Sequence, residues 1–405
     1  MTSKLPLTAK DINEAQERLA KHLPRTPLTH SDSFSQRFER DVFVKWDNKF
    51  RTGNFKERGA LNFLQQLNST EKKKGVCTAS AGNHALAVSW HCMHLNIPCS
   101  IVMPKYAPLV KVQTSASFGA NVSLVGEVFD ESYEYAQELS KKENLLFVPG
   151  YDHPNIISGA GVSGLEILYK LKDVDSIVVP IGGGGLAAGI ALAVKEKHPD
   201  IYILGVRSAW TKAHGEDAKG SEKQGAFAPA PIADGIAVKA IGEIPKLILD
   251  QYLDDLVYVE EKTIASAIVS YLYEERTVIE GAGAASLAAL IEGHLPKRYK
   301  RTVLLACGSN IDLNILSRLI QRSQFQKGQL LRVRVSVPDR PGSLAQLTSC
   351  ISDKSANVLE TYHERRFSKH PGNVEITFLL ETKNDAHKNE ILESLSELDL
   401  KPTEL

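Results

Sequence analysis

Apolar and polar residues alternate in short blocks along the first three quarters of the chain. Short apolar runs predict buried strands, and each is followed by a stretch whose apolar residues recur every three or four positions, as in a helix. Strands are predicted at residues 42–46, 75–78, 99–103, 121–125, 145–148, 176–180, 204–206 and 302–306. Helices are predicted at residues 54–67, 83–95, 108–119, 162–171, 186–197, 263–274 and 283–290. This alternation is typical of crossover units around a mostly parallel sheet, so it predicts an α/β fold.

The pattern changes near residue 325. Residues 330–337, 357–366 and 374–380 predict strands, and helices are predicted from Pro341 onward and over residues 384–398. The resulting order is βαββα, and any strand after the last helix should be short or missing. We therefore expect residues 1–325 to form one domain and residues 329–405 to form a second, smaller α+β domain.

The composition argues against several kinds of partner. The 48 basic and 48 acidic residues cancel, and no basic run indicates binding to nucleic acid or to an anionic membrane. Five cysteines without a CxxC pair are typical of a protein from a reducing compartment. The sequence has no signal-peptide core and no stretch of about 18 apolar residues that could cross a membrane. We expect a soluble, cytoplasmic protein.

A run of four glycines follows the predicted strand at residues 176–180 and precedes a predicted helix. Bare backbone amides converge in such a loop, and the helix dipole favours negative charge. The residues of this predicted phosphate seat are Gly182, Gly183, Gly184, Gly185 and Leu186. The run lacks the GxGxxG spacing of a dinucleotide site. The alternative is that the glycines form only a tight turn.

Two polar turns precede other predicted helices. Lys56 lies in the stretch TGNFKERGA, residues 52–60, and the turn SAGNH occupies residues 80–84. A phosphate seat, a lysine amine and a polar helix start are the parts that pyridoxal phosphate requires, because a lysine holds its aldehyde. A lone lysine at a helix start is far more often a solvated surface residue. Only the combination makes Lys56 a candidate for cofactor attachment.

Five motifs occur in a fixed order: TGNFKERGA, SAGNHA, GGGGL, then IADGIAV at residues 232–238 and CGSN at residues 307–310. In order and spacing they resemble the fold-type II pyridoxal-phosphate enzymes, and within them the serine/threonine dehydratase group. The resemblance covers residues 5–320. It implies two open, mostly parallel α/β subdomains and pyridoxal 5′-phosphate as the cofactor.

The resemblance also implies a role for each motif residue. Lys56 would hold the cofactor through a Schiff base and act as the catalytic residue, Asn83 would bond the ring hydroxyl, and Cys307 would face the pyridine nitrogen. The other implied cofactor contacts are Phe55 and Gly235 on the ring faces and Gly182, Gly183, Gly184, Gly185 and Leu186 at the phosphate. The substrate carboxylate would meet the helix-start residues Ser80, Gly82, Asn83 and His84.

Cys307 and Ala81 narrow the reaction that the resemblance implies. A thiol is a weak partner for the ring nitrogen, and a modest electron sink suits β-elimination better than transamination. The alternative for Cys307 is a packing residue at a strand end. Racemases of the group carry a serine as second base where this chain has Ala81, which transfers no proton. We expect Lys56 to remove the Cα proton of L-threonine, and of L-serine as well, giving ammonia and 2-oxobutanoate or pyruvate.

Some residues depart from the usual pattern of the group. Asn54 stands where serine is usual, which puts in doubt how the lysine turn is held. Arg207 stands where racemase-like members have an acidic metal ligand, so the presence of a metal stays unknown. Glu216, Asp217 and Glu280 are alternative cation or ring-side ligands, although surface and helix-start acids are the simpler interpretation.

The turn VPDRPGSL at residues 337–344 resembles that of the ACT family of amino-acid-sensing domains, and this second resemblance covers residues 329–405. It implies side-by-side pairing, hence a homodimer or homotetramer, and an amino-acid effector bound at the turn. Isoleucine or valine is the effector expected from the family. The implied contributors are Asp339, Gly342 and Asn357. The alternative is a module that only dimerises.

Other functions stay open beside threonine deamination. Serine racemase and a β-replacing synthase are enzyme alternatives, and an amino-acid sensor on a dead scaffold is the non-enzyme alternative, for which a purified protein would be colourless. Catabolic and biosynthetic roles, the latter in isoleucine biosynthesis, are both compatible with the sequence. Threonine and serine differ by one methyl group, which is worth only about 1–3 kcal/mol in an apolar pocket.

Overall fold

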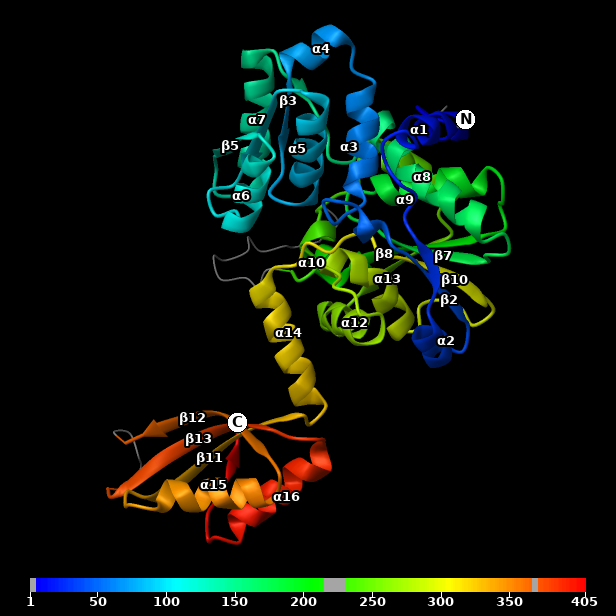
Figure 1. The fold of residues 1–405 in the computed structure, drawn as a ribbon. Helices are drawn as coiled ribbons and strands as arrows, with labels where there is room; N and C mark the ends of the chain where they lie inside the picture. Colours follow the sequence, from blue (N-terminus) through cyan, green and yellow to red (C-terminus); the bar gives the residue numbers. More distant parts are fainter. Residues whose placement is uncertain (1–4, 215–230, 366–370) are drawn as a thin grey trace. The chain divides into compact units, whose positions relative to one another are not determined.

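The computed structural model describes residues 5–214, 231–365 and 371–405 (Figure 1). The chain divides into two compact units, Met1–Ile311 and Asp312–Leu405, which we describe separately. Helix α14 (Leu313–Gln326) groups with the second unit. The division therefore lies before this helix, whereas we expected a boundary after it.

The larger sheet of the first unit has six strands in the order β1-β2-β10-β7-β8-β9. All neighbouring pairs are parallel except β1 with β2. The strands are β1 (Leu28–His30), β2 (Asp41–Lys45), β7 (Ser176–Pro180), β8 (Tyr202–Ser208), β9 (Asp255–Val259) and β10 (Arg301–Leu305). Every side chain of β7 is buried, as expected for a parallel strand covered on both faces.

The smaller sheet of the first unit has four parallel strands in the order β5-β4-β3-β6. They are β3 (Val76–Ala79), β4 (Cys99–Met103), β5 (Asn121–Leu124) and β6 (Leu146–Phe147). Two parallel sheets joined through helices confirm the predicted α/β fold with two subdomains. Because the carboxyl ends of parallel strands share one edge, the turns after β3, β7 and β10 are where a ligand is expected.

Helices surround both sheets of the first unit (Figure 1). The α-helices are α1 (Ala9–Leu19), α2 (Asp32–Phe38), α3 (Lys56–Gln65), α4 (Ser69–Lys74), α5 (Asn83–Leu95), α6 (Leu109–Ser117), α7 (Phe129–Glu143), α8 (Pro154–Lys170), α9 (Gly185–Lys195), α10 (Ala209–His214), α11 (Glu243–Tyr252), α12 (Glu261–Glu274) and α13 (Gly281–Ile291). Short 3₁₀ turns form η1 (Asp47–Lys49) and η2 (Asp234–Ile236). Helix α8 packs against both α9 and α3, which ties the two subdomains together.

The second unit contains a four-stranded antiparallel sheet in the order β12-β13-β11-β14. Its strands are β11 (Leu330–Pro338), β12 (Asn357–Glu364), β13 (Asn373–Glu381) and β14 (Thr403–Glu404), with helices α15 (Ser343–Asp353) and α16 (Asp385–Ser396). Buried and exposed residues alternate along β11, so one face of the sheet is covered and the other is open. The predicted α+β segment is confirmed, and its last strand is two residues long, as expected.

Local sequence signals explain where several helices begin. Thr8 and Asp11 form the capping box of α1, and Pro154 occupies the first turn of α8. Gly184 adopts φ +92° directly before α9, a left-handed conformation that favours glycine. The glycine run therefore serves as a sharp turn that leads straight into a helix start.

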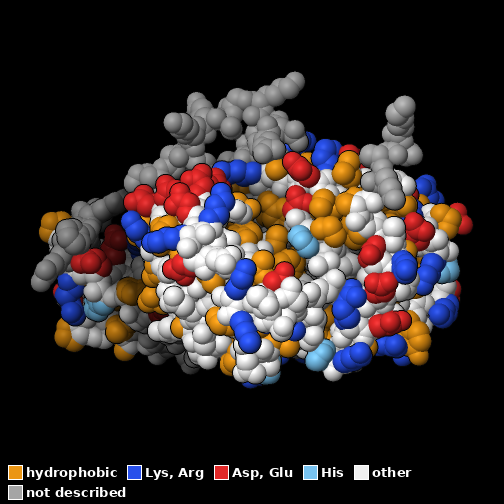
Figure 2. Space-filling model, turned by 90° about the horizontal axis from the view of Figure 1, so that it is seen from above, with side chains coloured by type: hydrophobic (Ala, Val, Ile, Leu, Met, Phe, Trp, Pro, Cys, Tyr) orange, Lys and Arg blue, Asp and Glu red, His pale blue; other side chains and the backbone are white. Residues whose placement is uncertain are grey.

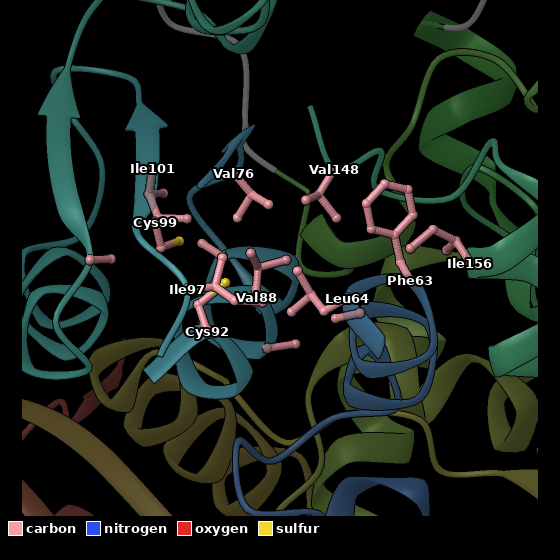
Figure 3. Close-up of a cluster of buried hydrophobic side chains, with 14 of the residues drawn as sticks. Phe63, Leu64, Val76, Val88, Cys92, Ile97, Cys99, Ile101, Val148 and Ile156 are labelled. Carbon is pink, nitrogen blue, oxygen red and sulfur yellow. The ribbon is translucent and has the colours of Figure 1, made fainter. Parts of the chain in front are cut away.

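A core of apolar side chains fixes the helix that begins at Lys56. Figure 3 shows Phe63 of α3 close to Val148 and Ile156, and Leu64 of α3 close to Val88 of α5. These side chains are buried, so α3 presents its apolar side to this core while its first residue remains at the edge. Packing thus determines where the lysine amine lies.

Charged side chains of both signs are mixed on the face shown in Figure 2, apart from one group of acidic side chains. This distribution agrees with a net charge of +0 and gives no extended basic surface on that face. In the described parts of the chain, no helix is both long enough and apolar enough to span a membrane.

Candidate active site

The turn before α3 is held by the side chain of Asn54. Its Oδ1 accepts a hydrogen bond from the backbone N–H of Lys56 at 3.0 Å, and its Nδ2 donates to the carbonyl of Thr52 at 2.8 Å. The N–H of Phe55 donates to the carbonyl of Cys307 at 2.9 Å. Asparagine therefore secures the turn that the sequence had left in doubt, and it brings Lys56 next to the end of β10.

The amine of Lys56 lies half-buried at the first position of α3. Its Nζ donates to the carbonyl of Gly150 at 2.6 Å. Burial lowers the pKa of Lys56 to about 8, although Cys307 and Glu280 act in the opposite direction. A substantial share of the amine is therefore neutral near pH 8, and the neutral amine is the form that attacks an aldehyde or accepts a proton.

The glycine run lies at the start of α9 with its amides available. In the described parts of the chain, no acceptor takes a hydrogen bond from the N–H groups of residues 182–186. A Cβ on Gly183 would overlap the ring of Tyr151, and a Cβ on Gly184 would lie 2.8 Å from Pro245. Unpaired amides at a helix start, in a loop that admits only glycine, fit the phosphate of the predicted cofactor.

The loop that carries Gly235 lies against this glycine run. A Cβ on Gly182 would lie 3.1 Å from the carbonyl oxygen of Gly235, and Leu186 is buried just beyond. On the other side, Lys56 Nζ lies 5.3 Å from the ring centroid of Phe55 and 5.9 Å from that of Tyr151. Tyr151 therefore lies against both the lysine amine and the glycine run, and the Gly235 loop adjoins that run.

Asn83, the first residue of α5, is linked to the opposite subdomain by two short hydrogen bonds. Its Nδ2 donates to Glu280 Oε1 at 2.6 Å, and its Oδ1 accepts from Asn310 Nδ2 at 2.6 Å. Glu280 is the residue directly before α13, and Asn310 belongs to the CGSN motif after β10. The structure therefore places Asn83 beside the CGSN motif, and its contact with the ring hydroxyl of the cofactor stays a prediction.

The predicted substrate turn forms the start of α5, but its side chains differ in availability. Ser80 Oγ already accepts a hydrogen bond from the N–H of Gly82 at 3.1 Å. The imidazole of His84 is buried, with Nε2 3.1 Å from the carbonyl of Val148. Burial lowers the pKa of His84 to about 3, so the ring is neutral. Any carboxylate at this turn would meet helix-start amides rather than an imidazolium.

Cys307 is buried at the end of β10. Burial raises the pKa of its thiol well above the usual value, and the nearby acids Glu280 and Asp47 add to that effect. The side chain is therefore a neutral thiol. A neutral thiol can share a hydrogen bond with a ring nitrogen but cannot keep it charged, which agrees with the expected weak electron sink.

A buried ionic network below the lysine turn was not predicted. Arg58 Nη2 lies 2.9 Å from Asp47 Oδ1 and 2.7 Å from Glu166 Oε2, and Lys45 Nζ lies 2.6 Å from Glu166 Oε2. All four side chains are buried. Arg58 stands two residues after Lys56, in the middle of the lysine motif. A charged residue on the core side of a predicted helix was the signal that could have revealed it.

Two other residues at the site were missed. Gly150 and Tyr151 contact the lysine amine and the glycine run, yet they belong to none of the motifs in the sequence. They follow β6, a strand of two residues. The carboxyl-end rule for parallel sheets could have indicated that this turn faces the site.

Metal ligands are not gathered in the described residues. Arg207, at the position compared with a metal ligand, donates from Nη2 to the carbonyl of Val238 at 2.6 Å. Glu216 and Asp217 lie outside the described residues. No group of three or more His, Cys, Asp or Glu side chains suited to a metal ion occurs within residues 5–214, 231–365 and 371–405.

The three expected effector residues do not meet in one copy of the second unit. Asp339 and Gly342 lie together between β11 and α15, with Gly342 at φ +96°. Asn357 begins β12, opposite Glu381, at the other end of the sheet. The eight-residue offset along β11 corresponds to about 26 Å at the usual rise per strand residue. A β-α-β connection returns to the starting edge, which explains the separation.

Comparison with known proteins agrees with this geometry. Residues 19–308 match the family of pyridoxal-phosphate-dependent enzymes. The chain is 37% identical to an L-threonine ammonia-lyase of Thermotoga maritima, over 95% of this chain and 96% of that protein. It is 40% identical to an L-threonine ammonia-lyase of Geobacter sulfurreducens, over 96% and 97% respectively.

Among solved structures, the processed form of threonine deaminase isoform 2 from Solanum lycopersicum is 31% identical, with a TM-score of 0.70. That match covers 80% of this chain and 91% of the tomato protein. The family match spans both parallel sheets, and the two bacterial relatives are similar over nearly the whole length. The chain therefore belongs to the fold-type II pyridoxal-phosphate-dependent enzymes, in the family of the threonine ammonia-lyases.

Proposed function

We propose that this protein deaminates L-threonine by β-elimination, giving 2-oxobutanoate and ammonia, and that it acts on L-serine in the same way to give pyruvate. The observation that carries the proposal is the half-buried amine of Lys56, whose pKa is lowered to about 8 within a ring of cofactor-binding motifs. The similarity to two threonine ammonia-lyases along nearly the whole chain supports the choice of substrate.

Pyridoxal phosphate, when bound through Lys56, supplies the electron sink that makes the Cα proton of the amino acid acidic. The amides of residues 182–186 would hold its phosphate, Asn83 would donate to its ring hydroxyl, and the neutral Cys307 thiol would serve as the weak partner of its ring nitrogen. Lys56 Nζ, as the neutral amine, would accept the Cα proton of the amino acid. The hydroxyl group would leave Cβ as water, so the proton that it gains balances the one lost from Cα. The enamine left from the amino acid would tautomerise to an imine, and water would hydrolyse this imine to the 2-oxo acid and ammonia.

Ala81 favours elimination over racemisation. It lies between Ser80 and Gly82 in the turn before α5, where a racemase of this group would need a second proton-transferring side chain. A methyl group neither donates nor accepts a proton. Formation of D-serine from L-serine at a rate comparable with ammonia release would contradict this assignment, and would point to the racemase alternative.

The second unit is proposed to regulate the first. The order of its sheet, the helices α15 and α16 and the turn at Asp339 and Gly342 support an ACT-like domain over residues 329–405, with isoleucine or valine as effector. Pairing of such domains would make the protein a homodimer or homotetramer. End-product binding would suit a biosynthetic role in the isoleucine pathway, and an enzyme insensitive to both amino acids would suit a catabolic one.

The test measures ammonia and 2-oxo acid from L-threonine, L-serine and D-serine with the full-length protein. Lys56→Ala should abolish turnover because the amine both holds the cofactor and moves the proton. Lys246→Ala is the matched control, since this exposed lysine forms an ion pair with Asp250 in the next turn of α11 and lies outside the predicted site. Turnover that survives in Lys56→Ala would overturn the site. A protein that stays colourless after incubation with the cofactor would favour the sensor.

A further inference from the structure

Three polar side chains from distant parts of the first unit form a closed ring of hydrogen bonds. Asn310 Nδ2 donates to Asn83 Oδ1 at 2.6 Å, and Asn83 Nδ2 donates to Glu280 Oε1 at 2.6 Å. The backbone N–H of Asn310 donates to Glu280 Oε2 at 3.1 Å, which closes the ring. Both oxygens of the carboxyl group are therefore in use.

The ring fixes which end of the Asn83 amide is nitrogen. Asn310 Nδ2 also donates to the backbone carbonyl of Thr52 at 2.8 Å, and a carbonyl oxygen can only accept. The atom of Asn83 that faces Asn310 must then be its oxygen, so its nitrogen faces Glu280. One hydrogen of Asn83 Nδ2 goes to Glu280, and the second is left to point elsewhere.

The space around Glu280 is shaped for this contact. A Cβ on Gly308 would overlap Glu280 Oε1, and a Cβ on Gly235 would lie 3.8 Å from the same oxygen. Glu280 is 4% exposed, and its own N–H donates to the carbonyl of Gly308 at 3.1 Å. Glycine at position 308 therefore lets the carboxyl group reach Asn83 from directly before α13.

We infer that Glu280 is a positioning residue, whose carboxyl group holds one hydrogen of the Asn83 amide so that the other is aimed at the ring hydroxyl of the cofactor. Asn310 assists by holding the amide oxygen of Asn83. This inference rests on the proposed function, in which Asn83 binds the cofactor. The acceptor Glu280 on the amide nitrogen and the donor Asn310 on the amide oxygen give the Asn83 amide a single orientation before the cofactor arrives, which lowers the ordering cost of binding.

The carboxyl group of Glu280 is expected to change its protonation state near neutral pH. Burial raises its pKa to about 7, Asp234 adds to the increase, and Asn83, Lys111 and the N–H of Asn310 oppose it. In the ionised form both oxygens of Glu280 are acceptors, as the closed ring of hydrogen bonds requires. A proton on Glu280 would compete with one of the two donors and weaken the hydrogen bond that holds Asn83.

Other titrating groups near Glu280 have to be separated from it. Ionised Glu280 raises the pKa of both Lys56 and Cys307, which face it from α3 and from the end of β10. Asp234 lies in η2, and Lys111 of α6 pairs with it at 3.4 Å. A pH effect belongs to Glu280 only if it disappears when this side chain alone is changed.

The test compares full-length wild type with Glu280→Gln, which keeps the shape but places a donor against Asn83 or against the N–H of Asn310. Binding of pyridoxal phosphate to the apoprotein is followed by absorbance, without substrate, from pH 5.5 to 8.5. We expect about tenfold weaker binding in Glu280→Gln at pH 8, from one lost charge-assisted hydrogen bond. We also expect the step near pH 7 in the wild-type binding curve to vanish. Glu274→Gln, on the outer helix α12, is the matched control and should keep both properties.

A second variant covers the case in which Glu280→Gln fails to fold. Asn310→Ala leaves the acid in place and frees the oxygen of Asn83, so it should weaken cofactor binding severalfold but keep the step near pH 7. If either folded variant binds the cofactor as the wild type does, with the same pH curve, the inference is wrong. If wild type itself binds no pyridoxal phosphate, the proposed function has failed instead.

Discussion

The turns before α5 and α9 in the first unit differ from the turn before α15 in the second unit in how firmly their surroundings are fixed. In the first unit, Asn83 is held by two hydrogen bonds of 2.6 Å, and Gly183 and Gly308 have no room for a Cβ. In the second unit, a Cβ on Gly342 would meet nothing within 4 Å, and Asp339 is 46% exposed. The turns of the first unit are therefore fixed before a ligand arrives, whereas the turn before α15 is open to water.

The difference matters because fixed, buried polar groups act strongly while exposed ones do not. Donors held in place in a water-poor site interact with a ligand at a low effective dielectric and need little reordering. The pair of Asp339 and Arg365, at 3.5 Å and largely in solvent, is screened and mobile. We therefore expect substitutions around the turns of the first unit to alter cofactor binding and folding strongly. Substitutions around the turn before α15 should have small effects.

The largest effect is expected when the ionic network behind Lys56 is broken. Arg58→Met leaves Asp47 and Glu166 buried without their main partner, and such a loss costs about 3–5 kcal/mol. Arg365→Met removes an exposed pair in the second unit and should cost under ~1 kcal/mol. Urea unfolding followed by tryptophan fluorescence measures the first value, since all three tryptophans lie in the first unit.

Unfolding of the second unit has to be followed by circular dichroism, because it contains no tryptophan. The urea midpoint of the first unit should fall in Arg58→Met and stay constant in Arg365→Met. Equal losses of unfolding free energy in the two variants would show that burial does not set the strength of these ion pairs. The contrast between the two units would then have no physical explanation.

A smaller effect is expected from adding one methyl group at a glycine in each unit, Gly183 before α9 and Gly342 before α15. Gly183→Ala forces a Cβ into the ring of Tyr151, and overpacking of this kind costs about 1–3 kcal/mol. We expect pyridoxal phosphate to bind about tenfold or more weakly, measured by absorbance titration of the apoprotein. Gly342→Ala has φ +96° and pays about 1 kcal/mol in backbone strain, but it should bind the cofactor normally. Similar losses of cofactor in both variants would contradict the assignment of the phosphate seat.

The pH dependence of cofactor attachment offers a third test. Burial holds the pKa of Lys56 at about 8, below its usual value, so the neutral amine prevails above that pH. The rate of attachment to the apoprotein should rise about tenfold per pH unit below pH 8 and level off above it, because only the neutral amine attacks the aldehyde. Stopped-flow absorbance measures this rate. A midpoint near that of an ordinary exposed lysine would contradict the buried placement of the amine.

Much of the first unit could be predicted from hydrophobic pattern alone. The strands at β2, β4 and β7 and the helix α5 fall where short apolar runs and helical periodicity indicate them. Helix α7 was not predicted, because only Ser132 and Ala136 of its residues are buried and charged residues are frequent in its sequence. Pattern reveals elements that face the core, and it misses those that only cover the surface.

The site shows the same division between motif and contact. Lys56, Asn83 and the glycine run could be predicted as site residues because each lies in a short motif at a helix start. Tyr151 was missed because its role depends on contact with Gly183, across more than thirty residues of sequence. Asn357 was grouped with Asp339 on resemblance, and strand register places the two at opposite ends of β11 and β12. Sequence motifs identify reactive groups, whereas register and packing decide which of them meet.

The smallest effect is expected at the turn before α15, where the register of β11 and β12 leads to a specific prediction. Isoleucine or valine binding to the full-length protein is measured by calorimetry for Asp339→Ala and Asn357→Ala. Asp339 lies beside the free helix start at Gly342, so its loss should weaken binding by a few fold, as for one exposed charged contact. Asn357 lies about 26 Å away along the sheet, so its replacement should change nothing unless another copy brings it to the turn. If Asn357→Ala binds the effector more weakly than wild type only at concentrations at which copies associate, the site is shared between copies. If the weaker binding persists in the monomer, it would contradict the register.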